Sequence, residues 1–150
     1  MSRRAATPVR FEHGVGERLA AHVATHPGSS MSSTANRLVD EGLRMIDHPG
    51  VVFRDGPTGR RAGLVAGPDV WEVVRAVKSA RTAEPDLDEE DILTLTATNS
   101  GLSLRLVRIA VRYWASHSAE IDAEIAAADA AEAAAEEAWL RERRLLARER

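Results

Sequence analysis

Residues 7–46 read TPVRFEHGVGERLAAHVATHPGSSMSSTANRLVDEGLRMI, and this stretch decides the expected fold. Val9 and Phe11 alternate with Arg10, which is the pattern of a half-buried β-strand. A single strand of about five residues leaves its backbone hydrogen-bonding groups unpaired. The simplest partner is the same strand of a second copy, so the pattern predicts a homodimer.

Two helices follow the expected strand. The first carries apolar residues at helical spacing and ends at His-Pro-Gly, residues 26–28. Ser32 is the expected N-cap of the second. The second helix has one apolar face, formed by Met31, Ala35, Leu38, Val39, Gly42, Leu43 and Ile46.

The strand TPVRF, the loop ATHPGSSMS and the helix STANRLVDEGLRM resemble the ribbon–helix–helix family of DNA-binding proteins. The resemblance covers roughly the first third of the chain. In that family two antiparallel strands enter the DNA major groove, and outward strand residues read the bases. The alternative is a dimerisation module that touches no DNA.

This resemblance implies a set of DNA contacts. Pro8, Arg10 and Glu12 would face the bases, with Arg10 as the bidentate reader of guanine. The amides of Ser32 and Ser33 would meet phosphate at the helix start. The chain departs from the family pattern, because only one of the three outward strand residues is a long donor, so base readout is expected to be thin.

The segment before the strand, SRRAA, is basic. Arg3 and Arg4 are expected to follow the strand along a DNA groove, as basic arms do. A frayed terminus with no role is the alternative.

Charge is divided unevenly along the 150 residues. Residues 1–82 carry twelve basic and eight acidic side chains, a balance of +4, whereas residues 83–150 carry eight and fifteen, a balance of −7. Double-stranded DNA therefore favours the front of the chain. The chain has no cysteine, no apolar run of membrane-spanning length and no secretory signal, so a cytoplasmic protein is expected.

Residues 51–65 have the pattern of a β-hairpin, because VVFRD and RRAGLV flank the turn-rich GPTG. Val51 and Phe53 are expected to face inward, and three arginines at positions 54, 60 and 61 to stay near the loop. Gly67-Pro68 is expected to open a helix that ends near Arg81.

The segment from AEPDLDEEDILTL through the helix that starts at Ser103 has the outline of a helix-turn-helix. Asp86 and Glu89 are spaced as a capping box, Asn99-Ser100-Gly101 ends the first helix, and Ser103 caps the second. Arg105, Arg108 and Arg112 line one face of that second helix and are candidate DNA contacts. A solvated face is the alternative.

The segments HPGVV, G-P-x-G-R-R and DVWEVV, with the helices after them, resemble VapB-like antitoxins over roughly residues 48–125. These small bacterial proteins join a hairpin to a helix-turn-helix and are usually encoded beside a toxin with a PIN-type nuclease fold. The family usually has a glycine–threonine–arginine turn, where this chain has Gly59-Arg60-Arg61. The resemblance implies a PIN-type toxin protein as a partner.

From Ser103 to Arg150 no proline or glycine interrupts the helical pattern, which would be one helix of about 45 residues if it is continuous. Residues 119–138 are almost all Ala, Glu and Asp, and the chain ends in WLRERRLLARER. Aromatic and aliphatic residues on a helix are the anchors of helix-in-groove recognition. The candidate partner-binding residues are Trp139, Leu140, Arg143, Arg144 and Leu146. The alternative is a tail that folds back onto its own dimer.

No motif for chemistry is found. His22 and His26 have the i, i+4 spacing of a metal pair, but no HExxH pattern accompanies them. The carboxylates of DLDEED (86–91) suit a helix N-terminus. No catalytic residue, metal site or cofactor is expected, and nothing argues for an enzyme.

The expected fold is mostly α with small β: a ribbon–helix–helix dimer (residues 1–47), a hairpin plus helix-turn-helix module (48–118) and a long C-terminal helical tail (119–150). The expected function is a homodimeric transcriptional repressor that is also the antitoxin of a type II toxin–antitoxin system. It would neutralise a PIN-type ribonuclease through its C-terminal helix. The alternatives are a stand-alone regulator or nucleoid-associated protein, and a coiled-coil adaptor.

Overall fold

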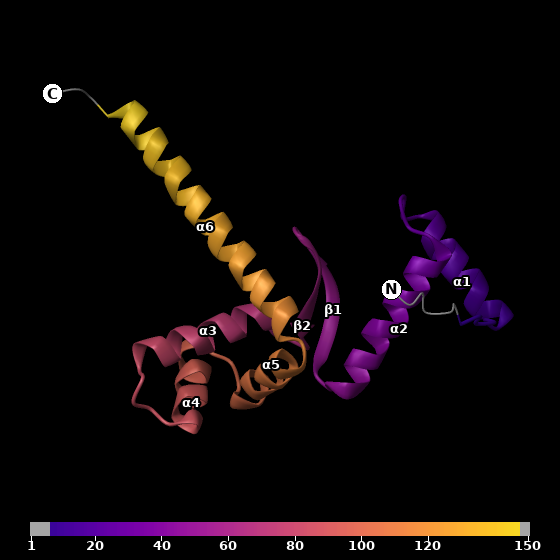
Figure 1. Cartoon of the computed structure of the whole chain (residues 1–150), viewed down its shortest axis with the longest axis horizontal. Helices are drawn as coiled ribbons and strands as arrows, with labels where there is room; N and C mark the ends of the chain where they lie inside the picture. The colour runs from indigo at the N-terminus through magenta and orange to yellow at the C-terminus, as the bar shows by residue number, and fades with distance from the viewer. Residues whose placement is uncertain (1–6, 148–150) are drawn as a thin grey trace, which may run out of the picture. The chain divides into compact units, whose positions relative to one another are not determined.

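The computed structural model describes residues 7–147, which form six α-helices and one small sheet (Figure 1). The sheet is a two-stranded antiparallel hairpin, so the expectation of a mostly helical fold with little β-structure is confirmed. The chain divides into two compact units, Met1–Arg44 and Met45–Arg150. No helix of the described residues is long and apolar enough to cross a membrane.

The first unit is a pair of helices. α1 spans His13–Ala24 and ends before His26-Pro27-Gly28, as predicted. Gly28 has a φ of 86°, a conformation that favours glycine, so glycine is the residue expected at this turn. α2 spans Met31–Asp47 and runs from the first unit into the second.

The predicted strand at residues 7–11 is not formed in the single chain. Residues 7–12 have no regular secondary structure, and all six are exposed. A lone strand has no backbone partner within its own motif, which is the physical reason for its absence here. Arg3 and Arg4 of the expected arm lie outside the described residues.

The second unit begins with the predicted hairpin. β1 (Val51–Gly56) pairs with β2 (Gly59–Leu64) in a register that sets Val51 opposite Leu64. Gly50, just before β1, has a φ of 100°, and a Cβ there would lie 2.8 Å from Ile109 Cδ1. Glycine is therefore required for the hairpin to approach the helix that carries Ile109.

α3 spans Val70–Ala83 and starts two residues after Pro68, which was expected in its first turn. Its N-cap is Asp69, which forms a capping box with Glu72: the Asp69 N–H donates to Glu72 Oε2 at 2.9 Å. The proline only precedes the cap. The carboxylates of the capping box accept hydrogen bonds from amides at the start of the helix, and a proline side chain has no acceptor for them.

α4 (Glu89–Ser100) and α5 (Leu104–Ser116) are joined by a turn of three residues. Gly101 closes α4 in the left-handed conformation, and Ser103 caps α5 by accepting from the Leu106 N–H, both as predicted. The predicted capping box of Asp86 and Glu89 is wrong. Asp88 caps α4 and accepts from the Asp91 N–H at 2.8 Å.

The helical pattern that starts at Ser103 is not one continuous helix. α5 ends at Ser116, and α6 spans Ser118–Leu146, with the break at His117. The His117 backbone has φ −134° and ψ 38°, outside the helical region, and its N–H binds the carbonyls of Tyr113 and Trp114. The kink lets both Tyr113 and Ile121 reach the core.

The core of the second unit lies between the hairpin and α3, α4 and α5, and the start of α6 joins it. Its largest fully buried side chains are Tyr113, Leu64, Ile121, Val70 and Val107. Because Ile121 is fully buried, the first turns of α6 belong to this unit's core. The C-terminal part of α6 extends away from these elements (Figure 1).

Candidate functional site

The C-terminal part of α6 exposes large apolar side chains. Every residue from 129 to 147 is exposed. Trp139 is 51% exposed, Leu145 84% and Leu146 73%, and Leu140 is exposed as well. Nothing in the described part of the chain covers this segment, so its apolar surface is presented to solvent.

Arg143 lies on the same side of α6 as Trp139. The Arg143 Cζ lies 5.0 Å from the centroid of the Trp139 ring, a cation–π contact one helical turn apart. The stacking holds the guanidinium against an apolar anchor. Arg144 is exposed beside it, and Arg141 forms an exposed ion pair with Glu137 at 3.6 Å on the opposite side.

The first unit carries a second apolar surface, on α1 and α2. A hollow of about 400 Å³ is lined by Phe11, Val15, Leu19, Leu38 and Val39, among others. Of these only Leu19 is buried. Met31 and Leu43 of the predicted apolar face are exposed as well, whereas the buried side chains of α2 are Thr34 and Glu41. A helix pair that leaves so much apolar surface exposed is typical of a surface that another molecule covers.

The predicted DNA-binding residues of the first unit lie at the surface. Pro8, Arg10 and Glu12 are all exposed. Ser32 is not the N-cap of α2, which was the expectation. Ser30 takes that place, because its Oγ accepts from the Ser33 N–H at 3.1 Å and the Ser33 Oγ accepts from the Ser30 N–H at 3.1 Å.

This reciprocal cap occupies the Ser33 amide in the single chain. A phosphate bound by that amide would have to replace the Ser30 hydroxyl. Ser32 remains exposed in the first turn of α2.

The three arginines of α5 differ in their surroundings. Arg105 and Arg112 are exposed, whereas Arg108 forms an ion pair with both carboxylate oxygens of Glu90 on α4. The three surround a shallow pocket that Pro49, Leu104 and Ile109 also line. Two of the three predicted cations are thus presented to solvent, and the third is engaged within the fold.

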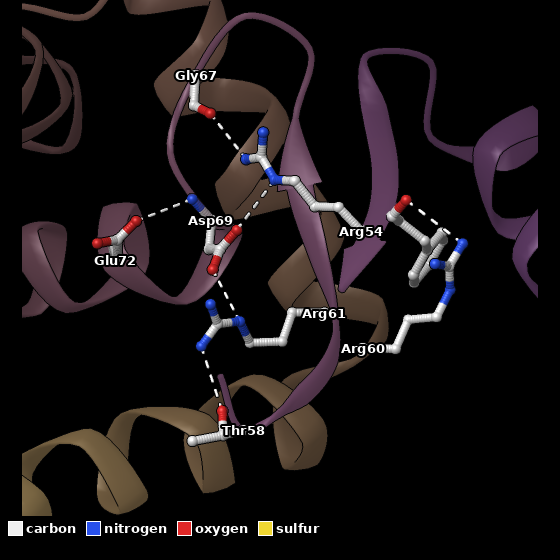
Figure 2. A network of polar contacts seen from close by, with 8 residues as sticks. Arg54, Thr58, Arg60, Arg61, Gly67, Asp69 and Glu72 are labelled. Carbon is white, nitrogen blue, oxygen red and sulfur yellow. Dashed lines mark hydrogen bonds and ion pairs between the residues drawn. The ribbon is translucent and has the colours of Figure 1, made fainter. Parts of the chain in front are cut away.

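Two of the three hairpin arginines, Arg54 and Arg61, converge on the N-terminus of α3 (Figure 2). Arg54 and Arg61 sit directly opposite each other in the β-ladder, where like charges repel. Asp69 accepts from Arg54 Nε at 3.2 Å and lies 2.9 Å from Arg61 Nε. One buried carboxylate therefore neutralises both guanidinium groups.

Two further contacts complete this network. Arg54 donates to the Gly67 carbonyl at 2.7 Å, and Arg61 donates to the Thr58 hydroxyl at 3.2 Å (Figure 2). Arg54 and Arg61 thus tie the hairpin to α3. The expectation that they stay near the loop is therefore wrong. Arg60 does stay at the hairpin, where its guanidinium lies 3.4 Å from an Asp55 carboxylate oxygen.

A hollow of about 310 Å³ separates the hairpin tip from α6. It is lined by Thr58, Arg60, Arg61 and Trp71 on one side, and by Glu124 and four alanines of α6 on the other. Burial and the negative charges of Glu120 and Asp69 raise the pKa of Glu124 to about 7, against the opposing effect of Arg61. Its Oε2 is buried and has no hydrogen-bond partner.

Charged groups attach α6 to α3 at two places along its length. Lys78 Nζ lies 2.7 Å from Asp122 Oδ1, which also accepts from Trp114 Nε1 at 2.8 Å. These two donors lower the pKa of Asp122 below its ordinary value. Farther along, Arg75 Nη1 lies 3.1 Å from Asp129 and 2.8 Å from Glu132.

Within the described part of the chain no group of three or more metal-binding side chains is found. His22 and His26 stack with ring centroids 4.0 Å apart, and the His26 Nδ1 lies 2.7 Å from the His22 carbonyl oxygen. His48 and His117 both pack against the Tyr113 ring.

Reasoning from sequence missed several of these residues. Asp69 was readable, because an aspartate three residues before Glu72 at the start of VWEVV has capping-box spacing. The sequence did not indicate that two arginines share Asp69, nor which residues bind Arg75 and Lys78. The contacts of Arg75 and Lys78 join segments more than 40 residues apart.

Comparison of the chain with protein-family models, with curated proteins and with solved structures found no match.

Proposed function

We propose that the protein is a homodimeric DNA-binding repressor and an antitoxin, which neutralises a PIN-type ribonuclease through the C-terminal part of α6. The observation that carries the proposal is the exposed segment around Trp139, Leu140 and Leu146. Tryptophan and arginine dominate interface energies, and a helix that bears them on one stripe is suited to a partner's groove. A protein with this function works in the cytoplasm, beside its DNA.

The charge of the segment supports an acidic partner. Arg143 rests on Trp139, so a groove that buries the tryptophan also takes the guanidinium out of water. An arginine buried in this way requires a carboxylate, because its desolvation otherwise costs several kcal/mol. A PIN-type nuclease carries clustered carboxylates at its metal site, and that cluster is the partner we infer for Arg143.

The apolar surface of α1 and α2 supports self-association. Val15, Leu38 and Val39 line its hollow, and a second copy would cover them. In that dimer residues 7–11 would pair with their own copy, which supplies the backbone partners that the single chain lacks. Arg10, exposed on this segment, is then the candidate base reader.

The antitoxin proposal is tested by co-expression with the adjacent gene's product. Removing residues 138–150 is expected to abolish rescue of growth and co-purification, while leaving dimerisation and DNA binding unchanged. Arg143→Ala is expected to weaken the complex by about 2–5 kcal/mol if its acidic partner is buried. Arg141→Ala is the matched control, because that arginine lies on the other side of the same helix.

Two outcomes would contradict the proposal. If a truncated chain still rescues growth, the C-terminal part of α6 does not bind the toxin. If Arg143→Ala and Arg141→Ala weaken the complex equally, the side of α6 that carries Trp139 is not the binding surface.

DNA binding is tested on a fragment from upstream of the chain's own gene. Arg10→Ala is expected to cost about 1–3 kcal/mol and to relax preference at one base position. A gel-shift series across salt concentrations separates this loss from a general loss of phosphate contacts. If the wild-type chain shifts no fragment, the repressor half of the proposal is wrong.

A further inference from the structure

The contacts between α3 and α6 change in kind along α6. Ile121 is fully buried and Ile125 packs against the core, so apolar packing holds the first two turns. Beyond them α6 offers alanines to the hollow of about 310 Å³ at the hairpin tip. Alanine side chains beside a void bury little, so apolar packing contributes little to holding this part of α6.

Arg75 acts where apolar packing ends. Its guanidinium binds Asp129 and Glu132, which are three residues apart and so lie on the same face of α6. The Trp71 ring lies 5.1 Å from the Arg75 Cζ, which restricts the arginine before it meets the carboxylates. The two carboxylates raise the pKa of Arg75 above its ordinary value.

Lys78 holds α6 one step closer to the core. It binds Asp122, and its ammonium group also lies 5.4 Å from the Trp114 ring centroid. Asp122 in turn accepts from Trp114, so α3, α5 and α6 meet at one carboxylate. Lys78 and Arg75 thus bind α6 at two points along its axis. At a rise of 1.5 Å per residue, these points lie about 10–15 Å apart.

We propose that Arg75 and Lys78 are positioning residues that fix the direction of α6 and so present its C-terminal segment to the partner in a set orientation. This inference rests on the proposed function for the identity of that partner. Residues 133–146 extend beyond the last of these ion pairs by about 21 Å. A small change of angle at α3 therefore moves Trp139 by several ångströms, and ordering the segment on binding costs affinity.

The inference is tested by a distance measurement on the full chain. The chain has no cysteine, so Thr98→Cys on α4 and Ala135→Cys on α6, both exposed positions, accept spin labels cleanly. Labelled chain is diluted in unlabelled chain, so that only distances within one copy are recorded. Wild type is expected to show one narrow distance distribution.

Charge reversal supplies the decisive variant. Arg75→Glu sets a third carboxylate beside Asp129 and Glu132 and is expected to broaden the distribution. The triple variant with Asp129→Arg and Glu132→Arg restores opposite charges and is expected to narrow it again. Arg112→Glu, an exposed arginine on α5, is the control for net charge. Salt at about 1 M is expected to broaden the wild-type distribution partway, because exposed ion pairs are screened.

Partner affinity is the second readout. Arg75→Glu is expected to weaken binding of the partner roughly tenfold, and the triple variant to recover it. An Arg75→Glu distribution as narrow as wild type would overturn the inference, as would a triple variant that stays broad. If the wild-type chain binds no toxin, the proposed function is wrong. The distance distributions still test whether Arg75 fixes the direction of α6, because they do not depend on the partner.

Discussion

Asp69 is the residue on which the hairpin and α3 both depend. The residue is the N-cap of α3 and is only 8% exposed, and its carboxylate neutralises Arg54 and Arg61, which face each other across the ladder. Asp69→Ala is expected to destabilise the second unit by about 2–4 kcal/mol, since it removes a cap and leaves two arginines without their counter-ion. Urea unfolding measures this loss. Asp88→Ala removes a cap whose carboxylate binds the Asp91 N–H and is not shared with arginines, and it is expected to cost about 1 kcal/mol. Equal losses would show that the arginines contribute nothing.

Glu124 is the residue that makes stability depend on pH. Its pKa is about 7 in the folded chain against an ordinary value of 4.5, because burial and two nearby carboxylates oppose its charge. Between these two pH values the folded state binds more protons than the unfolded state, so Glu124 makes stability fall as pH rises from about 4.5 to about 7.

Glu124→Gln keeps the shape of the neutral acid and removes its titration. The variant is expected to unfold at a higher temperature than wild type at pH 8 and at nearly the same temperature at pH 4.5. The gain at pH 8 is expected to stay below about 2 kcal/mol, because the Glu124 side chain is only partly buried and water partly screens its charge. Glu136→Gln, an exposed position on the same helix, is the control. Parallel pH profiles for wild type and Glu124→Gln would contradict the raised pKa.

At the scale of the element, α5 carries two exposed arginines, Arg105 and Arg112, and a third, Arg108, that forms an ion pair with Glu90. If α5 touches DNA, replacing Arg105 and Arg112 together by alanine is expected to weaken binding similarly across sequences. The slope of log affinity against log salt is then expected to fall by roughly two. Arg108→Ala is expected to change the slope less, because Glu90 already neutralises that guanidinium. Unchanged affinity and slope in the double variant would exclude α5 from the DNA interface.

At the scale of the whole molecule, the exposed face of α1 and α2 is the surface for which a second copy is proposed. Leu38→Asp introduces a charge into that face and is expected to weaken self-association by at least about 2 kcal/mol. Val65→Asp is the matched control, because Val65 is an equally exposed aliphatic residue outside that face. Light scattering over a concentration series measures both. A Leu38→Asp chain that stays as large as wild type would remove this face from the interface.

The candidate partner segment was predictable because it depends on composition. An alanine–glutamate helix has little to bury, so the tryptophan and leucines that follow it were expected to serve another molecule, and they are exposed in the structure. The attachment of α6 was not predictable. Arg75 and Glu132 are 57 residues apart, and no local rule relates them.

Short-range signals in the sequence determined the end of α1, the hairpin, the glycine that closes α4 and the serine that caps α5. Each of these depends on hydrogen bonds or steric limits among residues a few positions apart, so local chemistry suffices. The tertiary structure alone decided the break at His117, the sharing of Asp69, the raised pKa of Glu124 and the docking of α6. Those features arise where distant segments meet in a packed core, and their energies depend on burial and on charges that only folding brings together.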